Sequence, residues 1–408
     1  MKRIAIIGGG VSGLFCAITL LQSENAPQVT IFEKMNRVGK KILVTGNGRC
    51  NITNENADKI ERFYGENPTF PKYVLESFTP NNLIDYLAEN GLILRKENDK
   101  YYPFSEQAGT VLDFLRLKCE ILGANILVDK KIEKIIQRNG RFIVNNQEFD
   151  CVVIACGGKS SPHLGSDGSG YELFKSFNHT ITPLLPAITQ IKTENQFTKQ
   201  LKGIKADANL SIFVNNKLIR RDFGQILFAD YGISGPPAFQ LSAIAAKNYN
   251  NNCYVSLDFM PKFSVEQVKK QIQKIIANPF TYPLKAENLL TLLLNKRLGQ
   301  VIVKSCEINI NQDVYELSEA KIAQIAEKIK DFKLKVTGVN GFNNAQITFG
   351  GAKTDEFDSK TLQSKIVKNL YACGEILDVN GDCGGFNLQW AFSSAVAVAR
   401  AINGENND

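Results

Sequence analysis

The sequence predicts an α/β fold in which one nucleotide-binding domain is assembled from both ends of the chain around a long insertion. The first 33 residues alternate a buried strand, a glycine turn, a helix and a second strand. Residues 185–335 change character, and from residue 336 onward apolar strands that end in glycines return. A chain of 408 residues is long enough for two or three domains.

The opening motif carries the clearest signal for function. Gly8, Gly10 and Gly13 have the spacing G-x-G-x-x-G between an apolar strand and a helix. In the dinucleotide-binding pattern, Gly8 permits the tight turn and Gly10 lets the backbone approach a pyrophosphate, while Gly13 lets the helix lie close to the strand. The helix N-terminus offers free N–H groups and a positive dipole end to phosphates.

Charged residues near this motif complete its interpretation. Glu33 ends the second strand and is expected to accept hydrogen bonds from ribose hydroxyls. Arg37 is placed to reach the nucleotide phosphates, although an ordinary solvent-facing arginine would look the same. The rival interpretation is a secretory signal, because Lys2 and Arg3 precede an apolar stretch. Three consecutive glycines would break a signal helix, and no small-residue cleavage site follows, which favours the nucleotide motif.

Composition limits the other classes of function. The protein is 44% hydrophobic and 22% charged, and no apolar run is long enough to span a bilayer. The net charge of +7 comes from scattered lysines, so a basic nucleic-acid groove is not expected. Nine cysteines without a C-x-x-C pair, and no export signal, predict free thiols in the reducing cytoplasm. The two histidines, His163 and His179, have no ligand spacing, so no metal is expected.

Loops and the insertion fill the middle of the chain. Residues 44–54 combine two glycines with Arg, Cys and Asn, which predicts an irregular loop of the kind that lines ligands. The buried strand 151–156 ends in two glycines, and the turn-rich segment 165–170 is a further candidate ligand wall. The insertion has strand-like segments at 210–214, 217–219, 225–228 and 254–258 and predicted helices at 265–276, 286–298 and 318–332.

The last segment resembles the first. Residues 347–351 and 370–375 predict strands that end in glycines, and 378–382 form a polar loop. Gly384 and Gly385 introduce a long helix over 388–402, which provides a second electropositive helix start.

Motifs along the whole chain resemble those of the YhiN/BaiN-like bacterial flavoproteins, which are described as NAD(P)/FAD-dependent oxidoreductases or as an aminoacetone oxidase family. The matching stretches are GGGVSG, GKKILVTGNGRCNITN at 39–54, GGKSSP at 157–162, GSDGSGY at 165–171, LFADYGISGPPAFQLS at 227–242 and NLYACGEILDVNGDCGGFNLQWAFSSA at 369–395. Two positions depart from the family pattern: Cys383, where threonine is expected, and Phe386, which is often tyrosine. Neither change removes a backbone donor.

The resemblance implies a Rossmann-like FAD-binding domain built from residues 1–184 and 336–408. It also implies an inserted β-barrel-like domain at 185–262 and 300–335 that carries a helical subdomain at 263–299. The expected substrate is a small molecule, and the oligomeric state is left open.

The same resemblance implies which residues hold FAD. The adenosine and pyrophosphate half of FAD is expected to be bound by Gly8, Gly10, Ser12, Gly13, Glu33 and Arg37. Gly374 and Glu375 are placed near the ribityl chain. Asn387, Leu388 and Gln389 are placed at the pyrimidine edge of the flavin. The other expected contacts are Val11, Lys34, Lys41, Gly48, Ala155, Gly157, Gly158, Asp378 and Gly385. Arg49, Cys50 and Asn51 are the candidate catalytic residues near the ring.

FAD then carries the redox chemistry, and the protein supplies position and electrostatics. The resemblance implies reduction of an enone-like or lipid- or steroid-like molecule, with NAD(P)H as the expected electron donor. No second G-x-G-x-x-G follows a strand, so the electrons come from transiently docked NAD(P)H, from the organic substrate itself or from another protein. A disulfide-reductase mechanism needs two neighbouring cysteines after the first βαβ unit, and only Cys50 is present there. An oxygen-using oxidase, an RNA-associated flavoprotein and a flavin-binding protein without turnover remain alternatives, because fold does not fix function.

Overall fold

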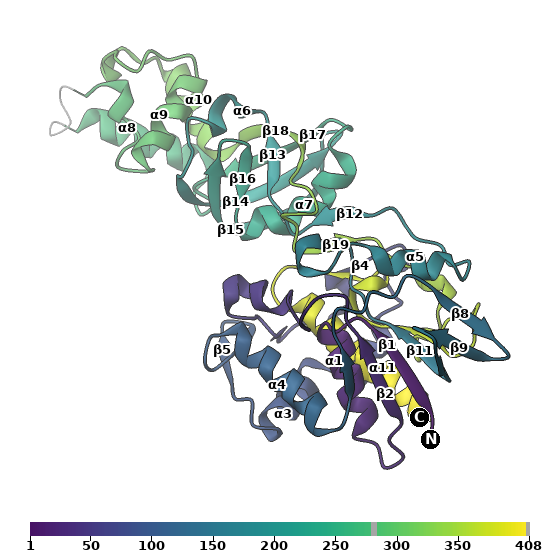
Figure 1. The fold of residues 1–408 in the computed structure, drawn as a ribbon. Helices are drawn as coiled ribbons and strands as arrows, with labels where there is room; N and C mark the ends of the chain where they lie inside the picture. Colours follow the sequence, from purple (N-terminus) through teal and green to yellow (C-terminus); the bar gives the residue numbers. More distant parts are fainter. Residues whose placement is uncertain (279–283, 405–408) are drawn as a thin grey trace. The chain divides into compact units, whose positions relative to one another are not determined.

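The computed structural model describes residues 1–278 and 284–404 and divides into two compact units. Unit 1 consists of Met1–Leu185 and Phe342–Asp408, and unit 2 is Pro186–Gly341. Both ends of the chain therefore belong to unit 1 (Figure 1). They are tied together by Nζ of Lys2, which donates a hydrogen bond of 2.7 Å to the carbonyl oxygen of Ile402.

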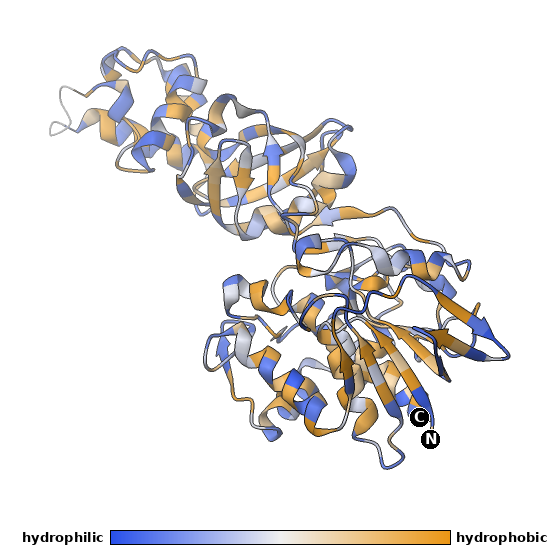
Figure 2. Ribbon diagram, in the orientation of Figure 1, coloured by the Kyte–Doolittle hydropathy of each residue, from blue (hydrophilic) through white to orange (hydrophobic). Residues whose placement is uncertain are grey.

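A five-stranded parallel sheet forms the centre of unit 1, in the order β20-β11-β1-β2-β7. Its strands are β1 Arg3–Ile7, β2 Gln28–Phe32, β7 Asn125–Leu127, β11 Cys151–Ile154 and β20 Leu370–Ala372. Figure 2 shows these strands as largely hydrophobic, as expected for a parallel sheet covered on both faces. The outermost strand β20 comes from the C-terminal segment, so the sheet is complete only when both chain ends are present.

Helices pack around this sheet, and α1 packs against α11 beside β1 (Figure 1). The helices of unit 1 are α1 Val11–Leu21, α2 Lys72–Ser77, α3 Pro80–Glu89, α4 Ala108–Ile121, α5 Ser169–Lys175 and α11 Phe386–Asn403. Its smaller strands are β3 Thr53–Asn54, β4 Phe63–Tyr64, β5 Leu94–Glu97, β6 Lys100–Pro103, β8 Ile135–Arg138, β9 Arg141–Val144, β10 Gln147–Phe149, β19 Ile347–Phe349 and β21 Asn380–Gly381. Among the described helices of the chain, none is long and apolar enough to cross a lipid bilayer.

Unit 2 is built on a closed six-stranded barrel in the order β13-β16-β15-β14-β17-β18. Its strands are β13 Ile191–Thr193, β14 Lys205–Val214, β15 Lys217–Ala229, β16 Gly232–Ser234, β17 Cys253–Asp258 and β18 Phe332–Val339, while β12 Leu185–Ala187 lies at the boundary between the units. Its helices are α6 Asn195–Thr198, α7 Pro236–Asn248, α8 Val265–Ala277, α9 Lys296–Ser305 and α10 Glu319–Lys330. Buried Leu210, Ile212, Val255 and Leu257 form part of its hydrophobic core.

The predicted α/β class with a Rossmann-like sheet is confirmed, and three local predictions are corrected. The predicted helix 286–298 is wrong: a short 3₁₀ turn, Ala286–Asn288, is followed by α9, which begins only at Lys296. The Asn295 side chain caps α9 by accepting a hydrogen bond of 3.0 Å from the N–H of Arg297, which fixes this later start. The loop predicted at 44–54 is partly regular, with 3₁₀ turns over Ile42–Gly48 and strand β3. The segment 165–170 ends inside α5.

The predicted limits of the helical subdomain, 263–299, stay a prediction. Unit 2 contains α8, α9 and α10 together with the barrel in one compact unit.

Candidate active site

The turn between β1 and α1 leaves open space in front of the helix. A Cβ on Gly8 would lie 2.4 Å from the carbonyl oxygen of Ala155, and one on Gly13 would lie 2.0 Å from that of Gly8, so both positions require glycine. A Cβ on Gly10 would instead meet nothing within 4 Å. Gly10 is the N-cap of α1, and no side chain caps this helix and no acid lies in its first turn. The first N–H groups of α1, which include Val11 and Ser12, are thus available to an anion.

Glu33 is fixed beside this turn by two backbone groups. Its Oε2 accepts a hydrogen bond of 2.9 Å from the N–H of Gly9, and its Oε1 accepts one of 2.8 Å from the N–H of Met35. Each carboxylate oxygen keeps a further lone pair, because a carboxylate can accept about four hydrogen bonds. The arrangement suits a pair of ribose hydroxyls.

The two cations after Glu33 have different surroundings. Nζ of Lys34 lies 2.5 Å from Oδ1 of Asp167 and 3.2 Å from Oγ of Ser169, so its charge is already matched. Burial alone would raise the pKa of Asp167, but hydrogen bonds from Lys34 and Ser169 lower it to about 2. Arg37 is exposed to solvent and precedes the buried Val38, whose side chain lies against Gly9.

Helices α1 and α11 meet at Gly374, directly after β20. A Cβ on Gly374 would lie 2.6 Å from Oγ of Ser12 in α1, and the φ of Gly374 is +80°. From α11, Nε1 of Trp390 donates to the carbonyl oxygen of Gly374 over 3.1 Å, and Oγ of Ser394 accepts from its N–H over 2.9 Å. The structure therefore brings the glycine turn and the C-terminal segment together, as the sequence predicts.

Glu375, the next residue, joins a cluster of glycines and polar groups. Its Oε2 lies 2.7 Å from Nζ of Lys41, and its Oε1 accepts from the N–H of Thr348 over 2.8 Å. A Cβ on Gly158 would lie 2.5 Å from Oγ1 of Thr348, and one on Gly157 would lie 3.2 Å from Oγ of Ser166. The predicted residues Lys41, Ala155, Gly157, Gly158, Gly374 and Glu375 thus lie around the β1–α1 turn.

At the start of α11 the predicted side chains are bonded within the protein. Asn387 accepts from the N–H of Gly381 and donates to its carbonyl oxygen, both over 2.8 Å. The fully buried Gln389 accepts from Oγ1 of Thr53 over 2.6 Å and donates to Ser393 and to the carbonyl oxygen of Phe78. Their amides therefore position the helix start, and the backbone N–H groups after Gly385, near the half-buried Leu388, are the groups left for a ligand.

Asp378 is also used internally. Its carboxylate is 2% exposed and accepts from the N–H of Glu66 and from Nδ2 of Asn380, each over 3.0 Å. Burial raises its pKa above the ordinary aspartate value, and the hydrogen bonds oppose this shift. Asp378 shapes the polar loop before α11.

The segment Gly46–Asn51 holds the three candidate catalytic residues in different environments. Arg49 pairs with Glu97 at 2.6 Å and Glu106 at 3.3 Å, and its guanidinium lies 4.3 Å from the centre of the Tyr102 ring. Gly48, which precedes it, adopts a φ of +85°.

Cys50 is buried with a φ of +57°. Burial raises the pKa of its thiol to about 11, against a smaller lowering by Thr45. A protonated, buried thiol is a poor nucleophile at neutral pH, so Cys50 has the environment of a packing residue.

Orphaned polar atoms indicate where a ligand fits. Oδ1 of Asn51, Nε of Arg49 and Oγ of Ser166 are buried without a hydrogen-bond partner. Buried polar atoms are normally paired, so these atoms fit a ligand that supplies the missing partners. Ser166 lies against Gly157 in the cluster around Glu375, and Asn51 lies near Gly384 before α11. Among residues 1–278 and 284–404, no group of three His, Cys, Asp or Glu side chains could hold a metal ion.

Sequence reasoning missed Thr348, Lys100 and Tyr171, whose hydroxyl is another buried orphan. Thr348 and Lys100 carry no ligand signal in their local sequence, because each reaches the site through long-range contacts. Tyr171 ends the stretch GSDGSGY at 165–171. Ser166 lies in the turn-rich segment that was a candidate ligand wall.

A family model described as "HI0933-like protein Rossmann domain" matches residues 2–401. The chain belongs to this family. It is therefore a FAD-dependent oxidoreductase with a Rossmann-type nucleotide-binding domain.

Relatives align over nearly the whole chain. A 3-dehydro-bile acid delta(4,6)-reductase of Clostridium scindens is 36% identical, covering 98% of this chain and 99% of the relative. A ribosomal RNA dihydrouridine synthase of Haemophilus influenzae is 30% identical, covering 98% of each. Among solved structures, the 3-ketosteroid delta1-dehydrogenase of Sterolibacterium denitrificans matches with a TM-score of 0.47 and 11% identity over the full length of both chains.

Proposed function

We propose that this protein uses FAD to reduce a carbon–carbon double bond conjugated to a carbonyl group, with NAD(P)H as the electron donor. Two relatives with different substrates support this reaction class. A 3-dehydro-delta(4,6) bile acid has double bonds conjugated to its 3-oxo group, and formation of dihydrouridine saturates the uracil double bond beside a carbonyl. The common element is an enone-like acceptor of a hydride.

The observation that carries the proposal is the meeting of α1 and α11 at Gly374. Around it, the uncapped α1 start and Glu33 suit the phosphates and ribose of FAD, and Glu375 with Lys41 suits its ribityl chain. Bound FAD supplies reversible hydride transfer. The backbone N–H groups at the start of α11 stabilise negative charge near the flavin, an effect of about 0.3–2 kcal/mol for a helix terminus.

The direct test is anaerobic stopped-flow reduction of the FAD-loaded protein by NADH and by NADPH, followed by mixing with a cyclic enone. We expect flavin bleaching by one nicotinamide nucleotide and reoxidation by the enone with formation of the saturated ketone. Protein that shows no flavin bands and takes up no FAD would refute the cofactor assignment. Reoxidation by oxygen alone, with candidate amines as reductants, would show an oxidase instead.

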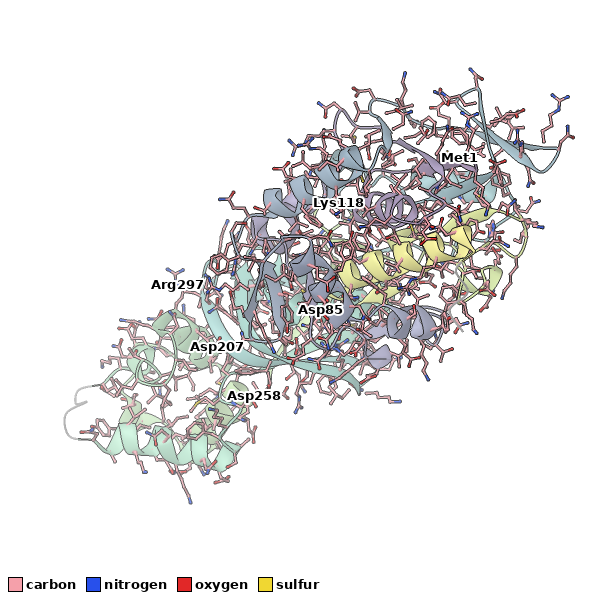
Figure 3. All side chains as sticks on the ribbon, turned by 90° about the horizontal axis from the view of Figure 1, so that it is seen from below. Met1, Asp85, Lys118, Asp207, Asp258 and Arg297 are labelled. Carbon is pink, nitrogen blue, oxygen red and sulfur yellow. The ribbon has the colours of Figure 1, made fainter. Side chains whose placement is uncertain are left out.

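A second candidate is a flavoenzyme that acts on RNA, and the distribution of charge favours it. Between residues 186 and 341 there are 21 lysines and arginines against 13 aspartates and glutamates, a net charge of +8, although the whole chain carries only +7. Unit 2 therefore carries all of the positive excess; exposed Arg297 of α9, labelled in Figure 3, is one of these cations. A basic unit and a neutral unit in one chain form the kind of charge asymmetry that suggests nucleic-acid contact.

A gel shift with bulk tRNA and rRNA fragments, measured from 50 to 200 mM salt, tests this candidate. Phosphate contacts make the affinity fall steeply with salt. Binding that is absent at the lowest salt would remove the RNA candidate and leave the small-molecule reductase.

A further inference from the structure

Lys100 and Asn51 meet at Gly384, one residue before the N-cap of α11. Lys100 begins β6, and Asn51 precedes β3, its partner strand. A Cβ on Gly384 would lie 3.2 Å from Cε and 3.9 Å from Nζ of Lys100, and 3.9 Å from Nδ2 of Asn51. The ammonium and the amide thus approach the same backbone position from two segments of unit 1.

The protein itself leaves these two groups unmatched. Asn51 is only 9% exposed, yet its Oδ1 is buried without a partner. Within residues 1–278 and 284–404, Nζ of Lys100 makes no hydrogen bond and no ion pair within 4 Å. Its charge acts at longer range on Glu97, opposite it on the hairpin, where a hydrogen bond from Arg49 lowers the pKa of the carboxyl group and Lys100 adds to that shift. Neighbouring Lys96 on the same hairpin is matched, because its Nζ lies 2.9 Å from Oε2 of Glu55. Nδ2 of Asn51, the amide atom that lies near Gly384, and Nζ of Lys100 are both hydrogen-bond donors. Two donors at one backbone position have the character of a subsite for an oxygen that carries negative charge. The orphaned Oδ1 of Asn51 is an acceptor, so it fits a donor on the ligand.

Arg49 does not serve in place of Lys100. Its guanidinium faces two carboxylates, those of Glu97 and Glu106, and stacks on Tyr102. Arg49 therefore holds the loop that presents Asn51. Its Nε stays a buried donor without a partner, but its charge is matched by these carboxylates, so Lys100 is the cation beside Gly384 that can meet a substrate.

We propose that Lys100 and Asn51 form an oxyanion subsite that receives the carbonyl oxygen of the substrate. The inference rests on the proposed reduction of a conjugated double bond. In that reaction the β-carbon gains a hydride from reduced FAD, the double bond shifts to lie between the α-carbon and the carbonyl carbon, and the carbonyl pair moves to oxygen. The α-carbon then takes a proton from water, and the carbonyl is restored.

Negative charge develops on the carbonyl oxygen during this step. An ammonium and an amide N–H placed there stabilise the enolate more than the neutral carbonyl, which is the requirement for accelerating the reaction. The N–H groups at the start of α11, adjacent to Gly384, add to the positive electrostatic potential that stabilises the enolate oxygen. Lys100 is therefore assigned as a catalytic residue, and the amide N–H of Asn51 as the second donor to the same carbonyl oxygen.

Phenolates provide a test that does not depend on turnover, because a phenolate is a planar conjugated oxyanion like an enolate. The FAD-loaded full chain is titrated at constant pH with 4-chlorophenol and with the more acidic pentafluorophenol. Binding is followed by the change in the flavin absorption bands. We expect the more acidic phenol to bind more tightly, and Lys100→Met to weaken that binding by about 10- to 100-fold, as for loss of a charged hydrogen bond.

Three variants make the result specific. Lys100→Arg keeps the charge and should retain most of the affinity, Asn51→Leu should weaken binding of both phenols, and Lys96→Met on the same hairpin should behave as wild type. Each variant is first compared with wild type for FAD content and thermal unfolding. Equal phenolate binding by Lys100→Met and wild type, or no phenolate binding by wild type, would overturn the inference.

The outcomes separate this inference from the proposed function. Enone reduction that proceeds while Lys100→Met leaves phenolate binding unchanged would overturn the subsite alone. Phenolate binding that depends on Lys100, in a protein that reduces no enone, would support the anion subsite and overturn the proposed reaction.

Discussion

Nζ of Lys41 lies 2.7 Å from Oε2 of Glu375, a contact between the loop after β2 and the loop after β20. Both side chains are partly exposed, at 26% and 19%. An ion pair of this kind contributes about 1 kcal/mol or less to stability. Its position beside Gly157 and Gly158 indicates that its main role is to set the carboxylate for a ligand.

Glu375→Ala should therefore weaken FAD binding more than it weakens the fold. We expect the dissociation constant for FAD to rise by about 10- to 100-fold, as for loss of a charged hydrogen bond. The loss of apoprotein stability should be about 1 kcal/mol or less. Flavin fluorescence titration and urea unfolding measure the two quantities. Lys41→Met is the comparison, because it removes the ion pair but keeps the carboxylate; a larger loss of FAD affinity in Glu375→Ala assigns the effect to the carboxylate. An unchanged FAD affinity in Glu375→Ala would show that the carboxylate has only a structural role.

Gly10→Ala should weaken FAD binding without affecting the fold, whereas Gly13→Ala should destabilise the fold itself. A Cβ at Gly10 enters open space in front of α1, so the apoprotein should unfold as wild type while FAD affinity falls. A Cβ at Gly13 would lie 2.0 Å from the carbonyl oxygen of Gly8, so the apoprotein itself should lose about 1–3 kcal/mol, the usual effect of overpacking. Thermal melts without FAD and FAD titrations provide the comparison. Full FAD affinity in Gly10→Ala would place the pyrophosphate elsewhere.

His179 should make the stability of unit 1 depend on pH. Its Nδ1 lies 2.9 Å from Oε2 of Glu356, its Nε2 lies 2.9 Å from Oγ of Ser364, and its ring stacks on Phe357. Burial lowers the pKa of His179, although Glu356 opposes this. The unfolded chain then takes up a proton near pH 6.5 while the folded protein does not, so stability should fall as pH drops below about 6.5 toward the folded pKa.

Melting curves of wild type and His179→Gln from pH 7.5 to 5.5 test this dependence. The variant should lose about 1–3 kcal/mol at pH 7.5 through the broken buried hydrogen bonds and should show a smaller further loss on acidification. Glu356, whose pKa is also below its ordinary value of 4.5, acts only below this range. The exposed His163 provides the matched control His163→Gln. Parallel pH curves for wild type and His179→Gln would contradict the assignment.

Cys50→Ala should leave turnover unchanged. Because burial raises the pKa of the Cys50 thiol to about 11, the pH profile of kcat/KM should show no thiol ionisation between pH 6 and 9. In the native protein the thiol should resist Ellman's reagent, and it should react after denaturation. Cys383→Ala, at a half-buried position before α11, serves for comparison. A large loss of activity in Cys50→Ala together with fast thiol labelling would instead support a catalytic role for Cys50.

The parts of the fold that depend on neighbouring residues could be predicted from the sequence. Strand β1, the glycine turn and α1 form one contiguous stretch whose spacing fixes its geometry, and Glu33 follows it at the end of β2. The helical spacing of Leu289, Leu290 and Leu294 predicts a helix at 286–298. The prediction is wrong because the side chain of Asn295 caps α9, which begins only after these leucines. Helical periodicity alone does not show where a cap interrupts it.

The candidate site was predictable only in part, for the same reason. Gly374 could be placed near the cofactor because the stretch 369–395 resembles the corresponding stretch of a flavoprotein family. The parallel pairing of β20 with β11, which brings it to the same edge of the sheet as the glycine turn, is seen only in the structure. The side-chain amide of Asn387 hydrogen-bonds to Gly381, and that of Gln389 hydrogen-bonds to Thr53. The Gln389 bond is a tertiary contact, and no local sequence pattern predicts either bond. The approach of Lys100 to Gly384 joins residues 284 positions apart in the chain, and only the folded structure shows it.

The divided sheet of unit 1 has a consequence for biosynthesis. Strand β20 and helix α11 follow residues 186–341 in the sequence. The ribosome therefore translates the entire barrel before the two elements that complete the flavin domain. Until β20 has been translated, the edge of β11 that pairs with it has no partner strand, although unit 2 can already fold. A complete FAD site can therefore form only after β20 and α11 have been synthesised.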